Sequence, residues 1–192
     1  MARSQILLIL LAFIAVGCNA KTASDTQPSR DEYDDAIDSF ALGTPDSETD
    51  DAVELIESAG VDAFRALIAR LDDETDACDR FMGSVGFIGP GPHKPYHPPI
   101  GGACFDILQG QIEGVWPKGY RQYHVLNHSN IQKWLEQRKN KNLHELQMEC
   151  ARISLDTAKQ KHEQNPSDWT KSCVEFLTDN LQKVQTKNRS AR

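Results

Sequence analysis

Histidines in the middle of the chain are the first side chains whose spacing could do chemistry. Two pairs are four residues apart, His93 with His97 and His124 with His128. On a helix this spacing places both rings on one face, where they could share a metal ion. Prolines surround the first pair, and the second pair straddles an expected helix start. We therefore predict exposed loop histidines and no metal site.

Hydrolysis would need a nucleophile with a base, or two converging acids. Asp106, Glu113 and His124 lie in or beside the irregular middle of the chain and could converge there. The sequence contains no Gly-x-Ser-x-Gly motif and no glycine-rich phosphate loop. We predict no catalytic residue and no cofactor, and a hydrolase that uses this region is kept as an alternative.

An aromatic and basic cluster is the better candidate for binding. Aromatic side chains and arginine bury a large area at low entropic cost, and they are enriched at recognition hot spots. A simpler explanation is that the aromatic rings close the hydrophobic core over the helices. The candidate residues are Trp116, Tyr120, Arg121, Tyr123 and His124.

The start of the chain predicts export. Arg3 precedes an apolar run from Ile6 to Gly17. This run is too short to cross a bilayer as a helix, which takes about 20 apolar residues. A positive start, a short apolar segment and small residues at its end are typical of a signal peptide, which we place at residues 1–17.

The end of this leader, Ala15-Val16-Gly17-Cys18, resembles the lipobox of bacterial lipoproteins. The resemblance implies that the Cys18 thiol is diacylated, that the signal is removed just before it, and that Asn19 favours the outer membrane over the inner one. Two acyl chains would give a stable anchor, and the polar residues 18–28 would form a tether. Two alternatives stay open: a secretory signal cut after Ala20, and an uncleaved anchor.

With Cys18 lipidated, four cysteines remain, and an even number in an exported chain indicates disulfides. Cys78 and Cys104 flank residues 79–102, and we predict a bridge between them that would contribute about 3–4 kcal/mol. Unbridged thiols and cross-pairs stay open. Cys150 and Cys173 lie about 12 Å apart along an expected hairpin, which favours buried free thiols.

Charge is distributed unevenly along the 192 residues. Residues 21–80 carry 18 acidic and 5 basic side chains, whereas residues 81–192 carry 10 acidic and 15 basic ones. Attraction between the two halves is the simplest explanation. An acidic face for a basic partner, or a basic face for an anionic glycan or lipid, is the alternative. An acidic pI and scattered basic residues argue against nucleic-acid binding.

Apolar residues at helical spacing predict an all-α fold, a compact irregular domain of six to seven helices over residues 29–187. Capping boxes are expected at Ser29-x-x-Glu32 and Asn142-x-x-Glu145. The break at 165–167 predicts an antiparallel helical hairpin at the end of the chain. One long Gly/Pro-rich loop interrupts the helices at 79–102, and residues 188–192 are an expected disordered tail.

Two local predictions complete the fold. Residues 51–73 are expected to form a tight antiparallel hairpin of two short helices, which resembles a single HEAT-type repeat. No second copy follows, so the resemblance implies helical packing and no solenoid. A short strand is expected near residues 120–126, and the next helix is expected to begin at Ser129 or Asn130.

Together these features predict a lipid-anchored protein of the bacterial cell envelope that binds or assembles with a partner and has no enzymatic activity. The expected partners are the membrane, through the lipid, and either an envelope protein or a cell-wall polymer. Nucleic acid is not expected. A secreted form is the alternative localisation, and a hydrolase or a purely structural protein is the alternative function.

Overall fold

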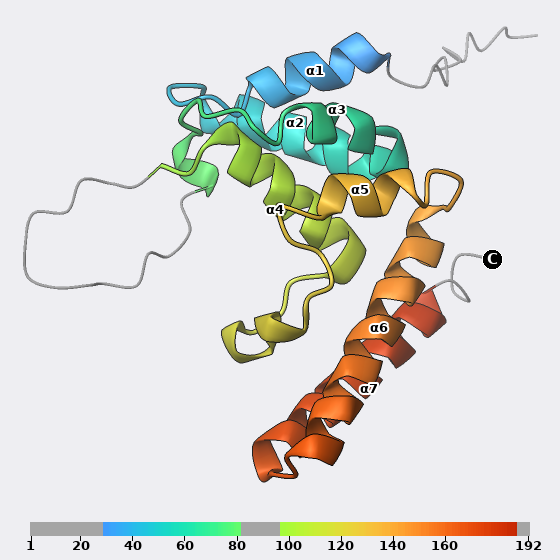
Figure 1. Ribbon diagram of the computed structural model, residues 1–192. Coiled ribbons are helices and arrows are strands. Elements are labelled where there is room, and N and C mark those ends of the chain that lie inside the picture. The colour runs from blue at the N-terminus through green and yellow to red at the C-terminus, as the bar shows by residue number, and fades with distance from the viewer. Residues whose placement is uncertain (1–28, 82–96, 188–192) are drawn as a thin grey trace, which may run out of the picture.

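The computed structural model describes residues 29–81 and 97–187, which fold into seven α-helices and three short 3-10 helices without a β-strand (Figure 1). The expected all-α fold is therefore confirmed. The α-helices are α1 Arg30–Asp38, α2 Asp46–Ala59, α3 Phe64–Ala69, α4 Ile100–Glu113, α5 Ile131–Glu136, α6 Leu143–Gln164 and α7 Asp168–Lys187. The 3-10 helices are η1 Gly60–Asp62, η2 Asp79–Phe81 and η3 Lys118–Tyr123. The leader, Cys18, the expected tether, His93 and the tail at 188–192 lie outside the described residues.

Both expected capping boxes are present. The Ser29 hydroxyl accepts a hydrogen bond from the Glu32 N–H, and the Glu32 carboxylate accepts one from the Ser29 N–H, each at 3.4 Å. Asn142 and Glu145 make the same exchange at 3.0 and 2.9 Å at the start of α6. These side chains accept hydrogen bonds from backbone N–H groups that have no partner within the helix, so they fix where α1 and α6 begin.

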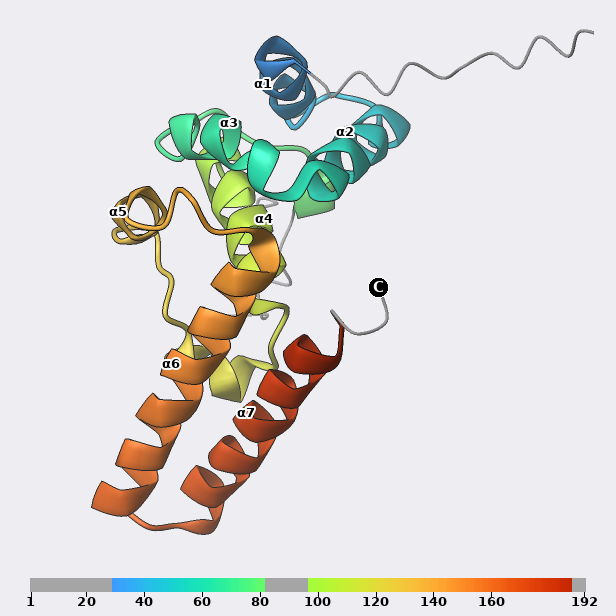
Figure 2. The ribbon, with the colours of Figure 1, turned by 90° about the vertical axis from the view of Figure 1, so that its right-hand side faces the viewer.

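The main core is built by α1 to α5 and the beginning of α6. Helix α1 packs on α2 and α3, α3 packs on α4, and α4 packs on α6 (Figure 2). Ile37, Ile56, Leu67 and Leu108 are completely buried where these helices meet. Because α4 touches both α3 and α6, it connects the N-terminal helices to the C-terminal hairpin.

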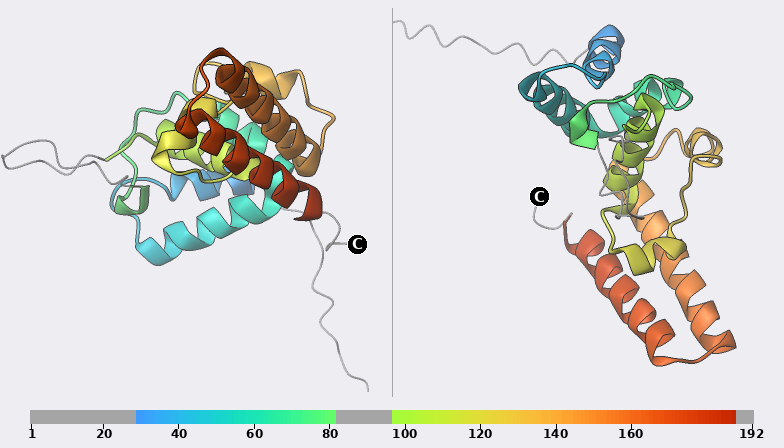
Figure 3. Two further views of the ribbon diagram at one scale, coloured as in Figure 1. Left: turned by 90° about the horizontal axis from the view of Figure 1, so that it is seen from below. Right: turned by 90° about the vertical axis from the view of Figure 1, so that its left-hand side faces the viewer.

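Helices α6 and α7 form the expected antiparallel hairpin, whose turn lies at the opposite end of the molecule from α1 (Figures 1 and 3). A second core runs along it. Leu155 and Ala158 of α6 pack there with Cys173 and Leu177 of α7, and residues of the preceding irregular segment cover them. The buried stripe of α6 passes through Ala151, Ser154, Leu155 and Ala158, which turns Ile153 outward.

Helix α4 begins at Ile100, three residues before the expected start, so two glycines assigned to the loop lie in its first turn. Close packing explains the use of glycine at the first of them. A Cβ atom on Gly101 would lie 2.1 Å from the Leu71 carbonyl oxygen, and the Gly101 N–H donates to the Asp73 carbonyl at 2.9 Å. The end of α3 and the start of α4 therefore meet backbone to backbone.

The strand expected near 120–126 is wrong, because η3 occupies most of that segment. The Tyr120 N–H donates to the Pro117 carbonyl at 2.9 Å, and the His124 N–H donates to the Arg121 carbonyl at 3.1 Å. The N–H groups of Val125 and Leu126 donate to the Glu113 carboxylate. Because these N–H groups are already bonded, they cannot pair with a neighbouring strand.

Residues 51–73 form helices as expected, but α2 and α3 do not pack chiefly on each other. Helix α2 makes its main helix contacts with α1, and α3 makes its main helix contacts with α1 and α4. Gly60, with φ of 57°, begins the 3-10 turn between them. The tight hairpin expected here is therefore not the main packing unit. The resemblance to a HEAT-type repeat stays a prediction.

Candidate functional site

The segment between α4 and α5 carries all five residues predicted to bind, and it lies against the α6–α7 hairpin. Trp116 and Tyr123 are buried, at 5 % and 3 % exposure, and belong to the second core. Tyr120 and His124 are half-buried, and Arg121 is exposed. Core packing therefore accounts for Trp116 and Tyr123, whereas the others reach the surface.

A buried contact between a carboxylate and a histidine fixes the path of this segment. The Glu113 side chain, at the end of α4, is fully buried, and its carboxylate lies 2.9 Å from His124 Nδ1. The same carboxylate accepts hydrogen bonds from the N–H groups of Val125 at 2.6 Å and Leu126 at 3.4 Å. One buried carboxylate thus satisfies two backbone donors and one side chain, as a buried charge requires.

Of the three residues considered for hydrolysis, the structure brings two together. Glu113 and His124 are in contact, but Asp106 is exposed and makes no hydrogen bond to either. The His124 ring stacks on Trp116 at 4.2 Å between ring centres, with the planes 15° apart. The carboxylate contacts one edge of the ring, and the indole covers one of its faces. This arrangement favours a structural role for the pair of Glu113 and His124.

Tyr123 is buried against α6 and α7. Lys161 lies over its ring at 4.6 Å from the ring centre. Burial, reinforced by the hydrogen bond with the Cys173 thiol, raises the pKa of Tyr123 to about 12. The hydroxyl therefore stays protonated at neutral pH and serves packing.

A continuous series of aromatic rings runs from this buried region to the surface. Trp116 meets Phe176 edge-on at 6.0 Å, Phe176 stacks on Tyr120 at 4.1 Å, and Tyr120 contacts Trp169 at 5.3 Å between ring centres. Trp169 ends the series with 47 % of its area exposed. We call Tyr120, Arg121 and Trp169 the aromatic patch.

Trp169 is the one member of the patch that was not predicted from the sequence. Its four-residue spacing from Cys173 is typical of a residue on the inward face of the last helix. It lies in the first turn of α7, where η3 covers only part of the ring. A Cβ atom on Gly119 would lie 2.9 Å from Trp169 Cη2, so a side chain at this position would require the indole to shift. In the sequence, the glycine at 119 beside Tyr120 is the feature that could have indicated a ring packed against this turn.

The four cysteines of the described residues are buried free thiols. The predicted bridge between Cys78 and Cys104 is absent because the two face different neighbours. Cys78 Sγ lies 3.6 Å from the Thr49 hydroxyl on α2. Cys104 is packed in the main core on α4, and burial raises its pKa to about 12. Cys150 and Cys173 are unbridged, as predicted.

The histidines have separate partners. His97 lies 3.4 Å from Asp79, and His93 is outside the described residues. His128 Nε2 lies 2.9 Å from the Leu71 carbonyl oxygen, whereas His124 faces Glu113, so this pair does not converge. Within residues 29–81 and 97–187, no three His, Cys, Asp or Glu side chains gather closely enough to hold a metal ion.

No helix in the described part of the chain combines the length and apolar character that a membrane crossing requires. Neither a known protein family, nor a curated protein, nor a solved structure matches this chain. The residues themselves therefore have to indicate the function: a leader that resembles a lipobox, a buried carboxylate and histidine that order one segment, and an aromatic patch on the surface.

Proposed function

We propose that this protein is a lipid-anchored component of the bacterial cell envelope that binds a partner and catalyses no reaction. The resemblance of Ala15-Val16-Gly17-Cys18 to a lipobox supports the anchor. A diacylated Cys18 would hold the helical domain at the membrane through residues 18–28. Asn19, the residue after this cysteine, resembles the corresponding residue of outer-membrane lipoproteins, and this favours the outer membrane.

The observation that carries the binding role is the aromatic patch. Trp169 exposes 47 % of its area beside half-buried Tyr120, and Arg121, which follows Tyr120 in the chain, is exposed. These three residue types dominate recognition hot spots. Glu113 holds the backbone just after Tyr120 and Arg121, and Trp169 is part of helix α7, so little order has to be gained when a partner binds.

The position of the patch suits a partner away from the membrane. Helix α7 begins at the turn of the hairpin, and this turn lies at the opposite end of the molecule from α1, which follows the expected tether (Figure 1). An envelope protein or a cell-wall polymer is therefore the proposed partner. A Trp and Tyr pair can pack on apolar side chains or on the faces of sugar rings.

A pull-down from envelope extract tests the binding role. The Cys18→Ser form serves as bait, and the double variant Trp169→Ala/Arg121→Ala should lose the partner. A matched control removes a similarly exposed apolar side chain and an arginine elsewhere, Leu42→Ala/Arg152→Ala. The control should recover as much partner as the parent. Equal recovery of a partner by all three baits would contradict the patch, and recovery by none of them would favour a purely structural protein.

A further inference from the structure

A groove is lined by residues of both α3 and α5, and α5 lies below α3 in Figure 1. Its volume is about 810 Å³. Apolar side chains of Phe64, Ile68, Leu135 and Leu146 line it, and Ala69 is exposed at its edge. We call this feature the basic groove, because its remaining lining is mostly cationic.

The charge of the lining is opposite to that of the chain. The protein has a net charge of −7, and its residues 21–80 are strongly acidic. Around the groove, however, five cationic side chains outnumber the two carboxylates of Asp72 and Glu136. The cations are Arg30, Arg65, Arg138, Lys139 and Lys141.

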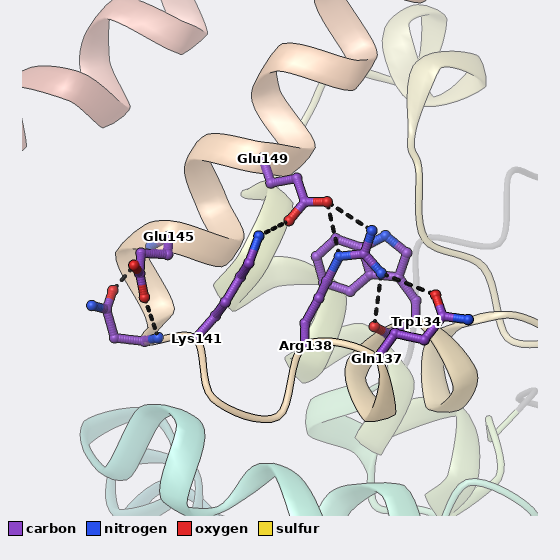
Figure 4. Close-up of polar contacts among 7 residues, drawn as sticks. Trp134, Gln137, Arg138, Lys141, Glu145 and Glu149 are labelled. Atoms are coloured by element: carbon purple, nitrogen blue, oxygen red, sulfur yellow. Dashed lines mark hydrogen bonds and ion pairs between the residues drawn. The ribbon is translucent and has the colours of Figure 1, made fainter.

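Two of these cations build the wall of the groove. Arg138 lies over the Trp134 ring at 4.1 Å, and its Nε and Nη2 donate to one Glu149 oxygen at 2.9 and 2.7 Å (Figure 4). Lys141 pairs with the other Glu149 oxygen. Because these contacts join α5 to α6, the groove has a fixed wall before anything binds.

Two other cations are available to a ligand. Arg65 on α3 and Lys139 after α5 are both exposed, and neither forms an ion pair within the described residues. They come from the two sides of the groove, so an anionic group lying along it could meet both. Apolar side chains in the same ligand would cover Ile68 and Leu135.

We propose that the basic groove binds an acidic peptide segment that carries apolar side chains, presented by a partner protein. The proposal rests on the proposed function in that the partner is taken to be an envelope protein. A hollow with an apolar floor and a charged rim suits an amphipathic segment laid along it. A bilayer surface would favour a flat or protruding basic face, because a recessed floor cannot reach the headgroups.

Fluorescence anisotropy tests the proposal with the Cys18→Ser chain. The probe is a fluorescein-labelled peptide of about 12 residues that repeats Glu-Leu-Leu-Glu, so that its leucines share one helical face. We expect saturable binding that weakens as salt is raised, because exposed charges are screened at higher ionic strength. A peptide with lysine in place of glutamate should not bind.

The double variant Arg65→Glu/Lys139→Glu should raise the Kd by at least about tenfold, which corresponds to about 1.4 kcal/mol. Its control, Arg152→Glu/Lys159→Glu, makes the same charge change at exposed positions of α6 and should leave the Kd unchanged. Ala69→Trp fills the edge of the groove without a charge change and should also weaken binding. Gln160→Trp, on the exposed side of α6, is its control.

Three results would overturn the proposal: no binding of the acidic peptide, equal weakening by the target and control variants, or binding only to phosphatidylglycerol vesicles. The last result would assign the cations to a membrane surface. All of these measurements use the unlipidated chain. A failure here therefore leaves the proposed lipid anchor and aromatic patch unaffected. If the anchor failed instead, the peptide could still bind the groove, but its source in an envelope protein would no longer be supported.

Discussion

Glu113 shows how a single side chain orders the candidate site. Its carboxylate is fully buried at the end of α4 and contacts His124, Val125 and Leu126, which lie 11 to 13 residues further along the chain. The contact draws the irregular segment back onto the helix that precedes it. Without it, the rings of this segment would lose the fixed backbone that brings Tyr120 next to Trp169.

Replacing Glu113 with alanine should lower the free energy of unfolding by about 2–4 kcal/mol, because two buried N–H groups lose their acceptor. Urea denaturation followed by circular dichroism measures this change. Glu54→Ala, at an exposed position of α2, is the control and should stay within about 0.5 kcal/mol of the parent. A Glu113→Ala variant as stable as the control would contradict the structural role of the carboxylate.

Helix α4 is the element that connects the two cores, and its glycines have different roles. Gly101 lies against the backbone at the end of α3, whereas a Cβ atom on Gly110 would meet nothing within 4 Å. Both lie within the same helix, so intrinsic helix propensity favours alanine at each. Any difference between the two substitutions therefore reports packing.

Gly101→Ala should destabilise the protein by at least about 2 kcal/mol, since the backbone of α3 or α4 has to move. Gly110→Ala should stabilise it by about 0.5–1 kcal/mol, because alanine loses less backbone entropy on folding. Thermal and urea unfolding of the two variants provide the comparison. Similar effects of the same sign at both positions would show that α3 and α4 do not meet as described.

The junction of α5 and α6 should be sensitive to acid. The hydrogen bond from Arg138, supported by the one from Lys141, holds the pKa of Glu149 below its ordinary value, although burial opposes the shift. A carboxylate with a lowered pKa in the folded state stabilises the protein above its unfolded pKa. This stabilisation is lost as the pH falls through the folded pKa.

The parent should therefore exceed Glu149→Gln in stability by about 1 kcal/mol near pH 7, and the gap should close as the pH falls below the ordinary pKa of a glutamate, about 4.5. Urea unfolding at a series of pH values measures it. Glu163→Gln, at an exposed position late in α6, should show no such gap at any pH. A constant difference between the parent and Glu149→Gln would contradict the assignment.

Local signals in the sequence predicted the elements well where a few neighbouring residues decide the structure. The capping boxes at Ser29 and Asn142, and the hairpin of α6 and α7, follow from such signals. The start of α4 was predicted too late, because the contact of Gly101 with Leu71 joins distant parts of the chain. The contact of Glu113 with two backbone N–H groups is equally non-local, and it replaced the expected strand. No sequence signal indicated that Arg138, Trp134 and Glu149 would meet.

The two ends of the molecule differ in what they could bind. The groove is lined by Arg30 at the start of α1, where the expected tether joins the domain. The hairpin turn and the start of α7 lie at the other end (Figure 3). Anchoring through Cys18 would therefore orient the molecule, with the groove toward the membrane and the aromatic patch toward the cell wall.

Mass spectrometry of the N-terminal peptide, from protein purified out of its native membranes, tests this central claim most directly. We expect a mature chain that begins at Cys18, with a diacylglyceryl group on its sulfur. A chain that retains Met1, or an unmodified chain that begins at Lys21, would contradict the proposed anchor and the orientation that follows from it.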